Sequence, residues 1–260
     1  MDRFEAAVRM SETEAIRSLD LSMFDLRDIA NICLQRPEVL ADIPERRDIL
    51  RSWVEGDDRP LMRTANRYML ELVSRAIGFI LLEYRELRPL FHEISPERIA
   101  DIGCGYGILD LFLHADLGME MLLIDTEYGP ERHLWYQPVG SGCSNLDVAR
   151  RFLVANGCDA AKLRLLNPRQ ESVMEAGEVD LAVSFLSCGY LYPADTYARF
   201  LRERVRPGGS VLLDIRATKA PEVLRALVGL GRFSRVGTVA GGLGLRLQIQ
   251  RPAASAVRAA

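Results

Sequence analysis

Three glycines alternate with other residues in the segment DIGCGYG. Glycine has no Cβ, so it can adopt positive φ angles and lets a ligand approach the backbone closely. Asp101 precedes Gly103 by two positions, and Cys104 separates Gly103 from Gly105. An apolar helical pattern follows Gly107 directly, which would point free backbone N–H groups toward the same ligand. These five residues are therefore predicted to form a loop that holds a nucleotide-like ligand.

An acidic residue about 20 positions after such a loop is the usual partner of a ribose in nucleoside-binding α/β domains. Asp125 has this spacing and closes the apolar segment MEMLLID. We expect its carboxylate to accept the ribose hydroxyls, with Thr126 beside it and Glu127 as a weaker alternative. The loop is not the dinucleotide-binding fingerprint, because position 108, where that pattern requires a third glycine, holds Ile.

Strands and helices alternate from residue 96 onward, which predicts an α/β fold with a parallel sheet and helices on both of its faces. The expected strands cover residues 98–102, 119–125, 162–166, 179–187 and 210–215, and the expected helices cover 108–115, 145–156 and 193–205. Segments 233–239 and 243–250 alternate apolar and polar residues across a glycine turn. This alternation predicts an antiparallel hairpin at the end of the domain.

Residues 1–95 show no strand pattern and are predicted to form helices. We therefore expect a helical extension over 1–95, the α/β domain over 96–252 and a frayed tail over 253–260. Apolar residues recur at three- and four-residue spacing from 61 to 84, which predicts one long amphipathic helix. Its apolar stripe would pack on the core of the protein, cover the ligand cleft, or contact a second copy of the chain. In the last case the protein would form a homodimer through its N-terminal helices.

The composition excludes several other classes. A net charge of −3 and an isoelectric point near 5.8 give no general attraction to nucleic acid. No apolar run is long enough to cross a bilayer, and the first residues lack the apolar segment of a secretory signal. The five cysteines are scattered without a C-x-x-C pair, which predicts a reducing environment and no metal site. We expect a cytoplasmic protein that binds a small molecule and neither nucleic acid nor a membrane.

The segments DIGCGYG, LLID, VDLAVS and RPGGSVLL occur in this order before the expected hairpin. Together they resemble the class I S-adenosylmethionine-dependent methyltransferases over about residues 96–250. The resemblance implies a Rossmann-like parallel sheet closed by an antiparallel C-terminal hairpin, and S-adenosyl-L-methionine as the cofactor. It also implies that Asn167, at the end of a strand, contacts the adenine, and that Ser184 belongs to the cofactor-binding residues.

The implied reaction moves a methyl group from a sulfonium to an acceptor, so the protein mainly positions the reactants and excludes water. A hydroxyl acceptor also needs a base, and histidine is the usual one near neutral pH. His133 is the first candidate, because it lies in the long loop after the second strand. Tyr190 and Tyr192 follow the fourth strand, where these methyltransferases place residues that face the methyl group, and we expect both to line the acceptor pocket.

A narrower resemblance links SFLSCGYLYPADTY to sugar O-methyltransferases, which have a histidine where this chain has Leu191. We therefore expect a methyltransferase that acts on a small-molecule hydroxyl, such as that of a sugar. Two alternatives remain. A catalytically silent relative is favoured by Leu191, whereas a nicotinamide-dependent oxidoreductase is disfavoured by the Ile at position 108 and by the closing hairpin.

Overall fold

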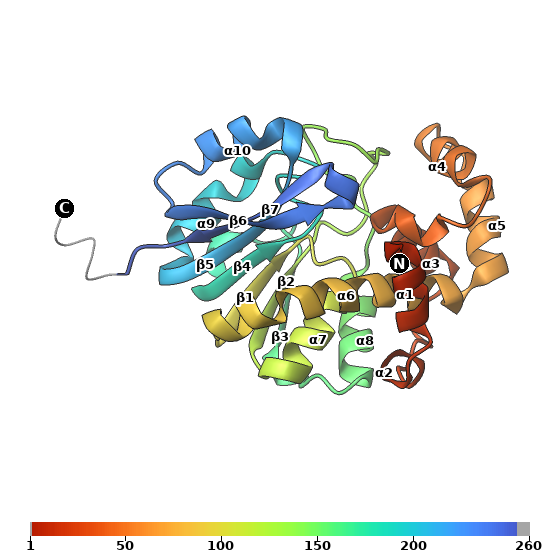
Figure 1. Ribbon diagram of the computed structural model, residues 1–260, viewed down its shortest axis with the longest axis horizontal. Helices are drawn as coiled ribbons and strands as arrows, with labels where there is room; N and C mark the ends of the chain where they lie inside the picture. Colours follow the sequence, from red (N-terminus) through yellow and green to blue (C-terminus); the bar gives the residue numbers. More distant parts are fainter. Residues whose placement is uncertain (1, 254–260) are drawn as a thin grey trace.

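A seven-stranded mixed sheet forms the centre of the computed structural model, which describes residues 2–253 (Figure 1). The strand order is β3-β2-β1-β4-β5-β7-β6, and β7 runs antiparallel to both of its neighbours. The strands are β1 (Arg98–Ile102), β2 (Glu120–Ile124), β3 (Leu163–Leu166), β4 (Val179–Ser184), β5 (Val205–Arg216), β6 (Arg232–Val239) and β7 (Gly244–Gln250). Five parallel strands closed by an antiparallel hairpin confirm the predicted fold class.

The fifth strand is longer than the sequence pattern predicted. It begins at Val205 rather than at Ser210, and the Arg-Pro-Gly-Gly segment between these two residues belongs to it. Pairing with β4 shifts register between Val179 and Leu181, which accommodates the extra residues as an irregularity. The predicted start of this strand at residue 210 is therefore wrong.

Helices cover both faces of the sheet, as the alternating pattern predicted (Figure 1). One face packs against α6 (Leu70–Ile94), α7 (Ile108–Leu117) and α8 (Leu146–Ala155), and the other packs against α9 (Ala198–Glu203) and α10 (Ala220–Ala226). Short 3-10 turns cover Pro37–Leu40, Ala160–Lys162, Val173–Glu175, Ala194–Tyr197, Ala217–Lys219 and Ala240–Gly242. The sheet is thus held between two packed layers of helices.

The N-terminal segment is helical up to Ile94, and the first strand starts at Arg98. Its helices before α6 are α1 (Arg3–Ser11), α2 (Glu14–Arg17), α3 (Leu26–Gln35), α4 (Arg46–Val54) and α5 (Arg59–Tyr68). The single helix predicted over 61–84 is in fact two, because Met69 adopts a φ of 46° between α5 and α6. A positive φ in a residue with a side chain cannot continue a right-handed helix.

The apolar stripe of α6 is buried inside the chain. Leu72, Val73, Ala76 and Ile77 have no exposed surface, and they share one hydrophobic cluster with residues of β1, β2, α7 and α8. The N-terminal helices therefore do not have a separate core, and the division at residue 95 stays a prediction. No helix of residues 2–253 combines the length and apolarity needed to span a membrane. Residues 254–260 of the predicted tail lie outside the described residues.

Candidate functional site

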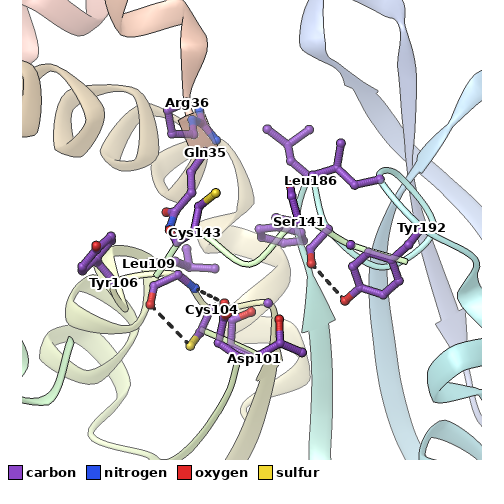
Figure 2. A pocket seen from close by; sticks show the side chains of 18 of the residues that line it. Gln35, Arg36, Asp101, Cys104, Tyr106, Leu109, Ser141, Cys143, Leu186 and Tyr192 are labelled. Carbon is purple, nitrogen blue, oxygen red and sulfur yellow. Dashed lines mark hydrogen bonds between the residues drawn. The ribbon is translucent and has the colours of Figure 1, made fainter. Parts of the chain in front are cut away.

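A cavity of about 310 Å³ lies at the carboxyl ends of β1, β2 and β4 (Figure 2). The strand order reverses between β1 and β4, and open α/β sheets bind their ligands at such a switch point. The glycine loop, the end of β2 and the segment after β4 line the sheet side of the cavity. The N-terminal helices α3 and α6 line the opposite side, so the cavity is enclosed between the sheet and the helical extension.

The glycine loop turns sharply between β1 and α7. Gly103, Gly105 and Gly107 all have positive φ angles, of 78°, 59° and 68°. A Cβ at Gly105 would lie 2.5 Å from Oε1 of Gln35, so any other residue at this position would have to displace the α3 side chain. The glycines were predicted from their spacing. The structure gives two physical reasons for glycine in this loop: the positive φ angles and the close approach of a neighbouring side chain.

Asp125 is the hub of a hydrogen-bond network below the cavity. Its Oδ2 accepts from the backbone N–H of Gly105 at 3.0 Å, and its Oδ1 accepts from the Glu127 N–H at 2.9 Å and from the Ser144 hydroxyl at 2.7 Å. Burial raises the pKa of Asp125, and these three donors oppose the rise. A carboxylate accepts about four hydrogen bonds, so one position remains for a ligand hydroxyl. Thr126 also lines the cavity.

Asp101 lines the cavity and has a second carboxyl group behind it. Asp110, in the first turn of α7, forms a side-chain hydrogen bond with Asp101, and burial raises the pKa of both groups. Two carboxyl groups can hydrogen-bond to one another only when one of them holds a proton. Asp101 and Asp110 are therefore able to share one proton between their two carboxyl groups.

The segment after β4 supplies two hydroxyl groups. Ser187 Oγ lies 3.1 Å from the hydroxyl of Tyr192, and both residues line the cavity next to Gly103. Burial raises the pKa of Tyr192 well above its ordinary value, so this phenol keeps its proton near neutral pH. The pair can orient an acceptor by hydrogen bonds, but it cannot remove a proton from one.

The helix predicted over 61–84 had a cover over the ligand cleft as one alternative, and α6 does line the cavity, whereas the contribution of α3 was not predicted. Arg36 forms a two-bond ion pair with Glu83, with distances of 2.9 and 3.2 Å, and both residues are buried beside the cavity. Burial alone would raise the pKa of Glu83, but the Arg36 guanidinium holds it below its ordinary value. Gln35 donates from Nε2 to the carbonyl of Cys143, which ties α3 to the loop after β2. The sequence of α3 carries no local pattern that would place this helix beside a glycine loop about 70 residues further along the chain.

Several predicted site residues line the cavity, and others do not. The residues that line it are Asp101, Gly103, Cys104, Gly105, Asp125, Thr126 and Tyr192. Burial raises the pKa of the Cys104 thiol well above its ordinary value, so this cysteine is not a thiolate. The predicted residues that do not line it are Gly107, His133, Asn167, Ser184 and Tyr190.

His133 is held inside its own loop. Its two ring nitrogens lie 2.8 Å from the carbonyl oxygen of Trp135 and 2.7 Å from that of Val139. Because both nitrogens are occupied, neither can take a proton from an acceptor in the cavity. We therefore do not carry His133 forward as a base.

The other displaced candidates have local structural partners. Ser184 is fully buried and donates to the carbonyl of Ile102 at 2.7 Å. Asn167 donates to Glu127 at 2.7 Å rather than pointing into the cavity. Tyr190 stacks under the guanidinium of Arg216, whose carbon lies 4.4 Å from the ring centre. Gly107 caps the N-terminus of α7.

No protein-family model matches this sequence, and the search of curated proteins found no match. Solved structures with similar folds include cofactor-bound Rv0187 from MTB, at 18% identity over 66% of this chain and 80% of that chain, with a TM-score of 0.48. An O-methyltransferase family protein from Burkholderia thailandensis matches at 15% identity over 87% and 73%, with a TM-score of 0.46.

A third similar structure is the 16S rRNA methyltransferase RsmC of T. thermophilus in complex with AdoMet and guanosine. It matches at 22% identity over 64% of this chain and 42% of that chain, with a TM-score of 0.44. Likenesses at these scores decide neither the activity nor the acceptor. The sheet order with its antiparallel β7 is what gives this chain the strand arrangement of the class I methyltransferases.

Proposed function

We propose that the protein is an S-adenosylmethionine-dependent methyltransferase that acts on a small-molecule acceptor. The observation that carries the proposal is the position of the cavity. It lies at the switch point of a sheet closed by an antiparallel strand, between a glycine loop and an acidic residue at the end of β2. The bound cofactor would supply a methyl group that is already activated on a sulfonium, so the chain itself needs to bind, orient and exclude water.

The residues around the cavity fit such a cofactor. Gly103 and Gly105 line the cavity with backbone atoms alone, so a ligand can approach the loop closely. Asp125 keeps one acceptor position for a ribose hydroxyl, and Asp101 offers a carboxyl to a cationic group. The chemistry of these groups suits a ligand with a sugar and positive charges, whereas the Ile at position 108 disfavours a dinucleotide.

The acceptor side of the cavity is mostly apolar. Its apolar side chains include Ile32, Ile80, Val139, Phe185, Leu186 and Leu191. The charged groups there are already paired, as Arg36 is with Glu83, so an uncharged acceptor fits best. We assign the hydroxyls of Ser187 and Tyr192 the role of holding the acceptor hydroxyl by hydrogen bonds.

An acceptor small enough to enter is favoured over a nucleic acid because α3 and α6 cover the cavity opposite the sheet. The test is methyl transfer from labelled S-adenosylmethionine to a panel of sugars and phenols. We expect turnover with at least one hydroxyl compound, and a lower kcat for Tyr192→Phe. Tyr128→Phe, on an exposed side chain of the loop after β2, serves as the matched control.

The catalytically silent relative remains the second candidate, and one observation favours it. Among the described residues that line the cavity, no unpaired side chain is placed as a base on the acceptor side: Glu83 is paired, and Tyr192 and Cys143 keep their protons because burial raises the pKa of each. A cofactor that binds without turnover on any acceptor would select this candidate. We expect the protein to be cytoplasmic, whether it is an active methyltransferase or a silent relative.

A further inference from the structure

Asp110 is a buried carboxyl group without an ordinary partner. It has no exposed surface, and among the described residues neither of its oxygens accepts a hydrogen bond of ordinary geometry from another residue. Buried polar groups are nearly always hydrogen-bonded, so an orphaned carboxyl needs a specific explanation. Within residues 2–253, the side chain that interacts with Asp110 is that of Asp101, which is 5% exposed and lines the cavity.

The described surroundings of this pair contain an acidic group and two thiols. Asp125 and Cys104 lie on the cavity side, from the end of β2 and from the glycine loop, and Cys158 lies on the α8 side. No lysine or arginine of residues 2–253 forms an ion pair with Asp101 or Asp110. Two buried, unneutralised carboxylates a hydrogen bond apart cannot both ionise, so the pair must hold a proton or bind a cation.

We propose that Asp110 makes Asp101 a proton-exchanging cation site, in which the free protein keeps one proton between the two carboxyl groups and a cationic group of the cofactor displaces it. The proposal rests on the proposed function for the identity of the ligand. When the cation arrives, the carboxyl O–H bond breaks and the proton leaves through the cavity that Asp101 faces. Asp110 is a positioning residue, because it acts on the ligand only through Asp101.

The protonation of Asp101 and Asp110 determines whether the affinity for a cationic ligand rises or falls with pH. Burial raises the pKa of Asp110 to about 7, and burial together with Asp110 raises the pKa of Asp101 well above its ordinary value. Below about pH 7 the cation must compete with the proton, so affinity for a cationic ligand rises with pH and levels off once the proton has left. A ligand of the same shape without a positive charge should bind with an affinity that does not follow this titration.

Calorimetry in buffers of different ionisation enthalpy measures the proton directly. The probes are S-adenosylmethionine, which carries two cationic groups, and 5′-methylthioadenosine, which carries none. For the native protein at pH 6.5 we expect S-adenosylmethionine to release about one proton per site. We expect 5′-methylthioadenosine to release none.

Asp110→Asn supplies the decisive comparison. An amide can donate to Asp101 without a stored proton, so the variant should bind S-adenosylmethionine with little proton release and a flatter pH profile. The exposed Asp147→Asn on α8 is the matched control and should behave as the native protein. If the native protein binds S-adenosylmethionine without releasing a proton, or if Asp110→Asn releases as much, the proposal is overturned while the proposed function stands.

Two results separate the remaining cases. Failure of both probes to bind would overturn the proposed function, and the cofactor role of the pair with it. Should Asp110→Asn fail to fold, the infrared difference spectrum of the native protein still decides. We expect S-adenosylmethionine to abolish the band of a protonated carboxyl, and persistence of that band in the complex would contradict the displacement.

Discussion

The hydroxyl of Tyr106 donates a hydrogen bond of 2.9 Å to Oδ1 of Asp28, which joins the glycine loop to α3. The same hydroxyl accepts from the Asn31 side chain at 3.1 Å, and the Tyr106 ring packs edge-on against Phe24. The loop that would carry the cofactor is therefore held from the N-terminal side as well as from its own sheet. The helical extension and the candidate site are one structural unit at this point.

Tyr106→Phe should destabilise the protein by about 1–3 kcal/mol, because it leaves the buried Asp28 carboxyl without its hydroxyl donor. Urea unfolding followed by circular dichroism measures this difference. Tyr128→Phe removes a hydroxyl from an exposed side chain and should change the free energy of unfolding little. Equal free energies of unfolding for Tyr106→Phe and the native protein would mean that the hydrogen bond between the loop and α3 does not stabilise the fold.

Gly105→Ala should weaken cofactor binding, since the new Cβ would lie 2.5 Å from Oε1 of Gln35 and the φ of 59° disfavours a side chain. The double variant with Gln35→Ala removes the collision and leaves the backbone strain. We expect it to recover part of the affinity in a titration with S-adenosylhomocysteine. If the double variant binds no better than Gly105→Ala, the contact with α3 is not the cause.

Asp110 should make the free protein less stable as the pH rises. An unfolded aspartate has a pKa of about 3.9, whereas burial raises the pKa of Asp110 in the folded state to about 7. Between these values the folded chain holds a proton that the unfolded chain has released, so the free energy of unfolding falls by up to about 1.4 kcal/mol per pH unit.

The variant Asp110→Asn cannot titrate at this position, so its stability should exceed that of the native protein by more at pH 8 than at pH 5. Thermal or urea unfolding of both proteins across this range measures the difference. A gap between native and variant that stays constant with pH would rule out a stored proton on this side chain.

Arg246 is the buried partner of Asp214, with distances of 2.6 and 2.7 Å between the guanidinium and the carboxylate. Arg246→Met should cost about 3–5 kcal/mol, because Asp214 has no exposed surface and would lose its counter-charge. Arg199→Met, which breaks an exposed pair with Glu203, should cost less than about 1 kcal/mol. Similar losses in the two variants would show that burial does not decide the strength of these pairs.

The fold could be predicted because its determinants are local or periodic. Apolar strands, glycine turns and the hairpin around residues 240–242 each leave a pattern in neighbouring residues, and the resemblance implied a parallel sheet closed by that hairpin. The break at Met69 was missed because the apolar period continues through it. A positive φ at a residue other than glycine is imposed by packing and has no local pattern.

The site was only partly predictable for a related reason. The residues of the glycine loop and Asp125 were found because a backbone conformation and a strand end fix where they lie. His133, by contrast, was chosen for its type and for its position in a long loop, and the structure places both of its ring nitrogens against carbonyl groups of that loop. Gln35 and Asp110 were missed because their importance depends on contacts that folding creates.

The central claim is that the cavity around Asp101, Gly105 and Asp125 binds an adenosyl amino acid. Calorimetric titration with S-adenosylhomocysteine and with NAD, on the native protein and on Asp125→Ala, tests it most directly. The account predicts saturable binding of S-adenosylhomocysteine, no binding of NAD, and a marked loss of affinity in Asp125→Ala. Binding of NAD with no heat from S-adenosylhomocysteine, or an unchanged affinity in Asp125→Ala, would contradict it.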